Sequence, residues 1–467
     1  MVFSSFLFLW FFFPPVFLAG MLVRKPKGQN LILLAASLLF YAWGEPVYVL
    51  LLIFSILFNW STGLFMERFP KAKKAFLVLS VAGNLLLLGW FKYADFVTNT
   101  LRRLFPSLGI PRISVPLPIG ISFFTFQAMA YVIDLYREKY PAQKDPLKLA
   151  LYISFFPQLI AGPIVRYIDV ERQLTNRHVS TEGIASGIRR FIYGLAKKVI
   201  LANTLAGLTD RLLAHPLTEL NTASCWVAAI AYTLQIYYDF SGYSDMAIGL
   251  GRIFGFRFPE NFRYPYLSRS ITEFWQRWHI SLGTWFKEYL YIPLGGNRKG
   301  KAFTCLNLLL VFAATGLWHG ATWRFVIWGL FHGFFRIVEH LGFSRFLQKH
   351  PHIARIYAIL VFGFGWVIFR ADSMSLALTQ IKMMIIPTAG PVHPGIYLGR
   401  FGLAALIAGI LGCGPLQEFF KRNSITRSLK DRFIEGFPEL LYCAVLLGVC
   451  ILFLGGDSYN PFIYFRF

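Results

Sequence analysis

Long apolar runs separated by short clusters of Lys and Arg constrain this chain more than any other feature. Hydrophobic residues make up 56% of the sequence, and the mean hydropathy is +0.53. Soluble domains contain about 45–50% apolar residues, and a helix that crosses a bilayer needs about 20 residues that are mostly apolar. Several runs approach that length, and the alternating pattern of a membrane β-barrel is absent. The sequence therefore predicts an all-α, polytopic membrane protein.

The Lys and Arg clusters account for the formal net charge of +23. In a soluble protein, such a charge would suggest nucleic-acid binding. Here the basic residues lie between apolar runs, as they do in the cytoplasmic loops of membrane proteins. We therefore expect the lipid bilayer, and no nucleic acid, as a partner. An anionic small ligand, such as the phosphates of coenzyme A, remains open for one cluster.

The apolar runs and basic loops together predict about eleven membrane crossings, with further re-entrant or interfacial helices. Residues 1–23 have neither a basic start nor a small-residue cleavage site, so we expect them to form a retained span. The last span, residues 440–454, follows a basic loop and leaves residues 455–467 as an extracytoplasmic tail. Because no internal repeat or linker divides the chain, residues 1–467 are expected to form a single transmembrane domain.

One histidine lies at a break between two apolar runs. His319 follows residues 302–314 and precedes residues 325–335, which are nearly all apolar. A titratable imidazole at membrane depth is costly and usually marks a functional site. The flanking glycines, Gly316 and Gly320, would let backbone or substrate approach the ring closely. We predict that His319 is the catalytic base of a membrane-embedded acyl transfer; a structural histidine bonded to a neighbouring helix is the alternative.

Other apolar runs are interrupted by helix-breaking or polar residues. Residues 157–163 contain two prolines and a glycine, and such breaks at membrane depth line a cavity or pack within protein. Asp239 and Asp245 follow another apolar run, where they either orient polar groups near a site or bond to neighbouring helices. Residues 271–291 are predicted to form one helix, which carries His279 among Trp275, Trp278 and Trp285. There His279 is either a structural histidine or a second polar contact to the donor or the acceptor.

Motifs of other acyl-transfer enzymes are absent. Residues 242–245 lack the second glycine of a GxSxG elbow, and Trp323 stands where an HxxxD arrangement starting at His319 would need Asp. A hydroxyl is a weak nucleophile at neutral pH and needs a base within hydrogen-bond reach, for which the pKa of histidine is suitable. A direct, base-assisted transfer is therefore favoured over an acyl-serine. The five cysteines show no CxxC spacing, so neither a zinc site nor a disulfide framework is predicted. No metal and no permanently bound cofactor is expected.

Six sequence segments, spread over most of the chain, are together typical of one known family. They are residues 117–127, 156–166, 238–249, 274–297, 317–323 and 462–467. Together they resemble the bacterial membrane-bound O-acyltransferase family, and within it the branch that O-acetylates alginate. The resemblance implies a ring of tilted membrane helices around a thinned centre, where a cytosolic acyl donor and an extracytoplasmic acceptor meet through two funnels. It also implies that His319 is the family's presumed general base and that His279 is a second histidine of this branch.

The resemblance further implies a substrate, a location and a partner. An acetyl group from cytosolic acetyl-CoA would cross the bacterial inner membrane for the O-acetylation of an exported polysaccharide, completed by an extracytoplasmic acetyltransferase of the SGNH type. Peptidoglycan O-acetylation and D-alanyl transfer to teichoic acid are alternatives within the same class. A membrane transporter is an alternative of another class, since its broken helices and buried polar groups would look similar. A transporter should show inverted repeats, and none is apparent.

A loop rich in glycine and basic residues is a candidate site for the donor. It covers residues 294–301 and includes Asn297, Arg298 and Lys299. Glycines expose backbone N–H groups, and Arg and Lys supply positive charge, so these residues are expected to bind the phosphates of acetyl-CoA. A plain cytoplasmic loop, basic only because of its location, is the alternative.

The C-terminal segment is a second candidate. Residues 462–467 read F-x-Y-x-x-F. By resemblance to a small partner protein of the teichoic-acid system, Tyr464 would accept the acyl group near His319 and pass it to the extracytoplasmic partner. The alternative is an aromatic anchor at the membrane surface, where Trp and Tyr gather.

Overall fold

The computed structural model describes residues 1–422, 437–456 and 462. Within these residues the regular structure is helical, and the only β-type pairing is an isolated bridge between Leu220 and Val392. The predicted all-α class is confirmed. Two compact units form: Met1–Phe191 with Met246–Glu260, and Ile192–Asp245 with Asn261–Phe467. The single domain over the whole chain stays a prediction.

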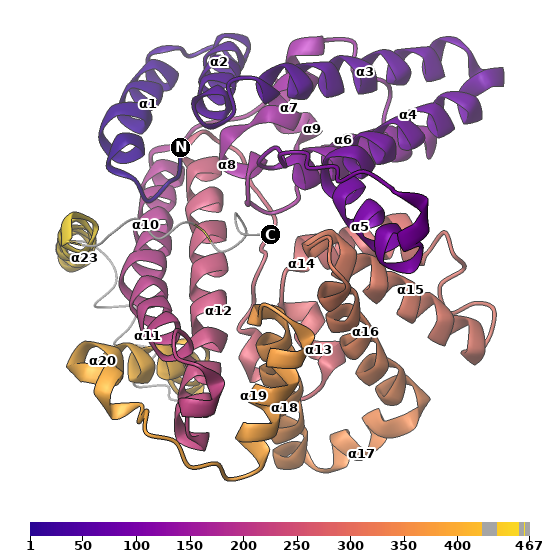
Figure 1. The fold of residues 1–467 in the computed structure, drawn as a ribbon. Coiled ribbons are helices and arrows are strands. Elements are labelled where there is room, and N and C mark those ends of the chain that lie inside the picture. Colours follow the sequence, from indigo (N-terminus) through magenta and orange to yellow (C-terminus); the bar gives the residue numbers. More distant parts are fainter. Residues whose placement is uncertain (423–436, 457–461, 463–467) are drawn as a thin grey trace. The chain divides into compact units, whose positions relative to one another are not determined.

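The first unit contains nine α-helices and several short 3-10 or π-helical segments, labelled η, together with the beginning of α10 and the end of α12 (Figure 1). The elements are η1 (Leu7–Phe12), α1 (Phe13–Leu22), α2 (Pro26–Gly44), α3 (Tyr48–Arg68), η2 (Pro70–Ala72), α4 (Lys73–Leu88), η3 (Gly89–Tyr93), α5 (Ala94–Leu104), η4 (Pro106–Leu108), α6 (Ile121–Tyr136), α7 (Pro146–Ser154), α8 (Phe156–Leu159), α9 (Tyr167–Thr175), α10 (Thr181–Ala196) and α12 (Thr222–Ile253).

Buried polar contacts join α3 to α4 in the first unit. The side-chain oxygen of Asn59 accepts hydrogen bonds from Ser80 and from Asn84, each at 2.8 Å. None of the three residues is more than 3% exposed. Such pairing satisfies groups that lipid could not hydrogen-bond. The chain break predicted at residues 157–163 is also confirmed, because the short helix α8 ends at Leu159 and an irregular, buried stretch follows it.

The second unit holds the remaining elements. They are η5 (Lys197–Ala202), α11 (Asn203–Leu213), η6 (Leu217–Glu219), η7 (Pro265–Leu267), α13 (Ile271–Arg277), α14 (Ile280–Phe286), η8 (Lys287–Tyr291), α15 (Lys301–His319), α16 (Trp323–Val338), η9 (Glu339–Phe343), α17 (Ser344–Lys349), α18 (Pro351–Arg370), α19 (Met374–Ile385), α20 (Gly395–Gly412), α21 (Pro415–Arg422) and α23 (Phe437–Gly456).

Seven helices of the described chain are long and apolar enough to cross a membrane. They cover Tyr48–Arg68, Pro70–Leu104, Thr181–Leu213, Lys301–His319, Pro351–Arg370, Gly395–Gly412 and Pro438–Gly456. Shorter apolar helices, such as Ile121–Tyr136, accompany them. The chain is therefore a multi-pass membrane protein, and the larger total of about eleven crossings stays a prediction.

Two glycines allow α15 and α16 to lie side by side (Figure 1). A Cβ atom at Gly316 would lie 2.2 Å from the carbonyl oxygen of Phe325, and one at Gly329 would lie 2.1 Å from that of Phe312. Both distances are far below van der Waals contact, so the two backbones approach as only glycine permits. The close approach that the sequence predicted at Gly316 is therefore made by the backbone of α16.

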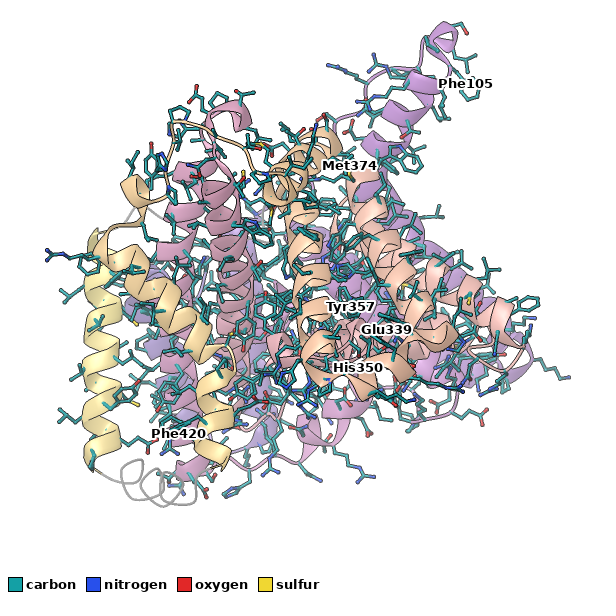
Figure 2. All side chains as sticks on the ribbon, turned by 90° about the horizontal axis from the view of Figure 1, so that it is seen from below. Phe105, Glu339, His350, Tyr357, Met374 and Phe420 are labelled. Atoms are coloured by element: carbon teal, nitrogen blue, oxygen red, sulfur yellow. The ribbon has the colours of Figure 1, made fainter. Side chains whose placement is uncertain are left out.

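A buried carboxylate anchors the start of α13. Glu339 is 1% exposed and accepts hydrogen bonds from the backbone N–H groups of Ile271 at 2.6 Å and Thr272 at 2.8 Å. The hydroxyl of Tyr357, which lies beside Glu339 in Figure 2, donates a further bond at 3.2 Å. A negative group at a helix N-terminus satisfies N–H groups that have no partner within the helix. Glu339 therefore fixes the helix that leads to His279.

The prediction of one helix over residues 271–291 is wrong. The chain forms α13 and then α14, and His279 lies between them with a left-handed φ of 46°. A residue in this conformation cannot continue an α-helix. The interruption turns the ring of His279 away from a helix surface and into the interior of the unit, where it is 1% exposed.

Candidate active site

His319 is the last residue of α15, and its imidazole is enclosed by aromatic rings. The next residue, Gly320, has extended backbone dihedral angles and ends the helix. The ring centre of His319 lies 5.0 Å from that of Trp318, 5.1 Å from Trp328 and 5.5 Å from Phe369. Only 3% of His319 is exposed. The residue is thus a buried histidine at a helix end, as the sequence predicted, in a setting made of large aromatic side chains.

His279 belongs to the same aromatic cluster. Its ring centre lies 5.8 Å from that of Trp318, which also contacts His319. Its ring centre also lies 4.7 Å from that of Phe240, with the two ring planes nearly perpendicular. The structure therefore brings together the two histidines that the sequence singled out, with Trp318 between them. The sequence placed His279 among the tryptophans of its own segment. In the structure, His279 contacts the rings of Trp318 and Phe240, which lie far from it in sequence.

One residue of the C-terminal segment reaches this cluster. Phe462 is 2% exposed, and its ring centre lies 4.7 Å from that of Tyr243 and 5.8 Å from that of Phe240. Phe240 in turn contacts His279. Tyr464 lies outside the described residues, but it follows Phe462 by two positions.

The predicted donor loop is not brought to the histidines. Asn297, Arg298 and Lys299 are exposed, and they precede α15, whereas His319 ends it. The eighteen steps of about 1.5 Å from Lys301 to His319 place the loop about 27 Å from His319 along the helix axis. The loop is ordered by Asn307, whose side chain donates to the carbonyl oxygen of Gly296 at 2.8 Å.

A polar cavity of about 390 Å³ opens beside His319. Its lining comes from α11, α12, the α15–α16 turn and the end of α18: Asp210, Tyr232, Gln235, Gly320, Ala321, Thr322, Arg324, Phe325, Arg370 and Asp372. Arg370 pairs with Asp210 at 2.7 Å, and the guanidinium of Arg324 lies 4.7 Å from the ring centre of Phe325.

Two polar groups of this cavity have no hydrogen-bond partner in the described part of the chain. They are the side-chain oxygen of Gln235, a residue that is 7% exposed, and one terminal nitrogen of Arg324. Buried polar groups are nearly always paired in folded proteins. With aromatic walls and both donors and acceptors, the cavity suits a polar, hydroxyl-bearing ligand.

The two aspartates next to the cluster form ion pairs. Asp239 pairs with Lys198 at 2.6 Å, and both side chains are at most 5% exposed. Asp245 pairs with Lys197 at 2.6 Å. Both contacts join α12 to η5, which favours the structural alternative for these aspartates. Within the described residues no group of three His, Cys, Asp or Glu side chains could hold a metal ion.

Sequence reasoning missed several residues of the cluster. Asn261 is fully buried and hydrogen-bonds to His279, although 18 positions separate them. Trp328 contacts both His319 and a third histidine, His332, with each pair of ring centres 5.1 Å apart. A run of aromatic residues was visible in the sequence, but nothing in its spacing shows which rings meet a histidine.

The family of the chain follows from comparison with known proteins. Residues 119–378 match the model of MBOAT, the membrane-bound O-acyltransferase family. This match spans the whole histidine cluster except Phe462. The chain belongs to the membrane-bound O-acyltransferase family and is an O-acyltransferase, which sets aside the transporter alternative.

Individual relatives show which members of the family this chain resembles most strongly. The probable alginate O-acetylase of Pseudomonas putida is 39% identical over 100% of both chains. The peptidoglycan O-acetyltransferase of Helicobacter pylori is 38% identical over 100% of this chain and 98% of that protein. The teichoic acid D-alanyltransferase of Bacillus subtilis is 28% identical over 52% of this chain and 66% of that protein. Similarity to O-acetylating enzymes is thus both higher and more extensive.

Proposed function

We propose that this chain transfers acetyl groups from cytosolic acetyl-CoA across the bacterial inner membrane for the O-acetylation of an exported polysaccharide. The relatives similar over their whole length carry the names of alginate and peptidoglycan O-acetylating enzymes, which supports acetyl over D-alanyl. An alginate-like acceptor is favoured because five relatives named as probable alginate O-acetylases are 37–44% identical to this chain. Peptidoglycan is the second candidate.

The chemistry is assigned to His319 as general base. Its imidazole takes the proton of the attacking hydroxyl while a carbon–oxygen bond forms at the acetyl carbonyl and the carbon–sulfur bond to coenzyme A breaks. The proton then passes to the leaving thiolate, which departs as the free thiol. Such base catalysis contributes roughly 10²–10⁴-fold to a rate. The observation that carries this assignment is the ring of Trp318, which contacts both His319 and His279.

The cavity beside His319 is assigned to the acceptor side. Basic residues before α15 and after α16 predict that those helix ends face the cytoplasm, so the opposite end, with His319, faces outward. The cavity lies at this outward end, and its polar lining supports a hydroxyl-bearing acceptor.

Tyr464 is assigned as the first acceptor of the acetyl group. Phe462 packs in the aromatic cluster that includes His279, and this supports a tail whose next residues are close to the reaction. An extracytoplasmic acetyltransferase of the SGNH type would then take the acetyl group from Tyr464 to the polysaccharide. Asn297, Arg298 and Lys299 remain the proposed contacts of the donor's phosphates, which requires the donor to extend along α15.

The test uses the purified full-length protein in vesicles supplied with radiolabelled acetyl-CoA. We expect release of free coenzyme A and label on the protein itself, followed by label on an added alginate-type polymer when the partner is present. A chain that ignores acetyl-CoA and accepts a D-alanyl donor would refute the proposal in favour of teichoic-acid D-alanylation.

A further inference from the structure

Asn261 contacts His279 from within a small, fully buried polar group. Asn261 itself is 0% exposed. Its side-chain oxygen lies 3.2 Å from the Nδ1 atom of His279, 2.9 Å from the hydroxyl of Ser281 and 3.2 Å from the backbone nitrogen of Ser281. Its side-chain nitrogen donates to the hydroxyl of Ser244 at 3.1 Å. All four residues belong to the second unit.

The orientation of this amide follows from its partners. The backbone N–H of Ser281 can only donate, so the Asn261 atom that faces it at 3.2 Å must be the oxygen. The opposite atom is then the NH₂ group, which faces the hydroxyl of Ser244, a group able to accept. An inverted amide would set two donors against each other at Ser281.

The oxygen of Asn261 in turn selects the tautomer of His279. Because Nδ1 faces an acceptor, Nδ1 must carry the hydrogen, and Nε2 of the neutral ring must then carry a lone pair. The hydroxyl of Ser281 also lies 3.5 Å from Nδ1, and it can accept from Nδ1 while it donates to Asn261. The contacts with Asn261 and with Ser281 therefore both favour the Nδ1–H tautomer of His279.

The Nε2 atom lies on the opposite edge of the ring. In the described part of the chain it has no hydrogen-bond partner, although His279 is 1% exposed. A buried acceptor without a donor costs free energy, about 1–3 kcal/mol in proteins. The rings of Phe240 and Trp318 contact His279, and Trp318 also contacts His319, so this unpaired acceptor lies in the same aromatic cluster as the proposed base.

We propose that Asn261 is a positioning residue that holds His279 as the Nδ1–H tautomer, so that Nε2 accepts a hydrogen bond from an N–H or O–H group of the bound acceptor, next to the hydroxyl that His319 deprotonates. This inference rests on the proposed function, because it assigns a partner to that site. It also excludes a different role. A neutral His279 held in this way cannot donate from Nε2 to the oxyanion of the tetrahedral intermediate, so that oxygen needs another donor.

The first experiment reads the tautomer without reference to activity. The full-length protein is labelled with ¹⁵N-histidine in lipid, and the His279→Gln variant identifies the signals of His279. We expect a protonated Nδ1 and an unprotonated Nε2 in the wild type, and a loss of that preference in Asn261→Leu. A wild-type His279 protonated at Nε2 would overturn the proposal, whether or not the protein transfers acetyl groups.

The second experiment measures transfer. Leucine resembles asparagine in size but has no acceptor, so Asn261→Leu should lower kcat at least about tenfold with little change in the KM for acetyl-CoA. Asn261→Asp keeps an acceptor and should retain most of the activity. Asn221 is the matched control, since its side chain also contacts a histidine, His393, at 3.0 Å; Asn221→Leu should not alter the tautomer signals of His279.

The outcomes separate this inference from the function on which it rests. If the wild type shows the Nδ1–H tautomer but transfers no acetyl group, the proposed function fails and the positioning by Asn261 stands. If Asn261→Leu transfers at the wild-type rate, the role of Asn261 in the reaction is refuted. Should Asn261→Leu not fold, Asn261→Asp and the wild-type spectrum still decide, because an Asp variant with no activity would contradict the acceptor role.

Discussion

The ring of Phe462 lies 4.7 Å from the ring of Tyr243, at an interplanar angle of 32°. Tyr243 is one helical turn beyond Phe240 on α12, and Phe240 contacts both Phe462 and the ring of His279. Phe462 is therefore connected to the histidine cluster through a single layer of aromatic side chains. This relationship makes the role of the tail directly testable.

Replacing Tyr464 by Phe removes one hydroxyl and nothing else. If that hydroxyl accepts the acetyl group, Tyr464→Phe should abolish the acetylation of the product while the protein still folds. The measurement is the label on polymer after incubation with radiolabelled acetyl-CoA and partner. Tyr442→Phe is the matched control, because Tyr442 is 56% exposed on α23, and it should behave as wild type.

Phe462→Ala tests the placement of the tail itself. Loss of a buried phenylalanine removes the contacts with Tyr243 and Phe240, so the tail should dissociate from the cluster and acetylation should fall. Normal acetylation in both Tyr464→Phe and Phe462→Ala would leave the tail as an aromatic anchor and rule out the relay.

His319→Ala should lower kcat by roughly 10²–10⁴-fold, because the attacking hydroxyl loses its base. The KM for acetyl-CoA should change little, since the ring is not assigned to donor binding. Release of free coenzyme A is the measurement. His352→Ala serves as control, because His352 is exposed at the start of α18. If the kcat of His319→Ala stayed within a factor of about two or three of the wild-type value, His319 could not be the general base.

Arg324→Gln should raise the KM for the added polysaccharide acceptor without a comparable fall in kcat. Arg324 lines the cavity beside His319 and keeps one nitrogen without a partner among the described residues, so it is available to bind a ligand. Loss of one hydrogen bond to a charged group is worth about 1.5–3 kcal/mol, equivalent to roughly 10–100-fold in affinity. Arg345→Gln, on the exposed surface of α17, is the control. An unchanged KM for the acceptor would show that the acceptor does not bind in this cavity.

The sequence was sufficient for those features that depend on local pattern. Apolar runs of membrane-spanning length predicted the helices, the two prolines and a glycine predicted the break at residues 157–163, and the break between two apolar runs at His319 coincides with a helix end. The conformation of His279 could not be predicted in this way. Its left-handed φ depends on contacts with Asn261 and with α12, which periodicity does not encode.

Most of the candidate site also depends on pairing between distant residues. Glu339 holds the start of α13 from 68 positions away, and Arg370 meets Asp210 across 160 positions. Clusters of Lys and Arg between apolar runs predicted cytoplasmic loops, whereas Arg370 is not part of such a cluster and lines the cavity near the end of α15. Charge counts predict topology only on average, whereas a charge that lines a cavity is selected for what it binds.

Gly329→Ala should destabilise the protein more than an ordinary helix substitution. A Cβ atom at Gly329 would lie 2.1 Å from the backbone carbonyl oxygen of Phe312, so α15 and α16 would have to separate. Overpacking of this kind costs about 1–3 kcal/mol. Gly363→Ala on α18 is the control, because a Cβ atom there meets nothing within 4 Å, and alanine has the higher helix propensity.

Thermal unfolding in detergent measures both glycine variants, and acetyl transfer adds a second readout. Trp328 is the neighbour of Gly329 on α16 and contacts His319, so separation of the helices should also lower the rate of transfer in Gly329→Ala. Gly363→Ala should leave both the unfolding temperature and the rate near wild type. Equal stability of the two variants would mean that α15 and α16 are not as closely packed as the glycines imply, and that the position of His319 does not depend on this contact.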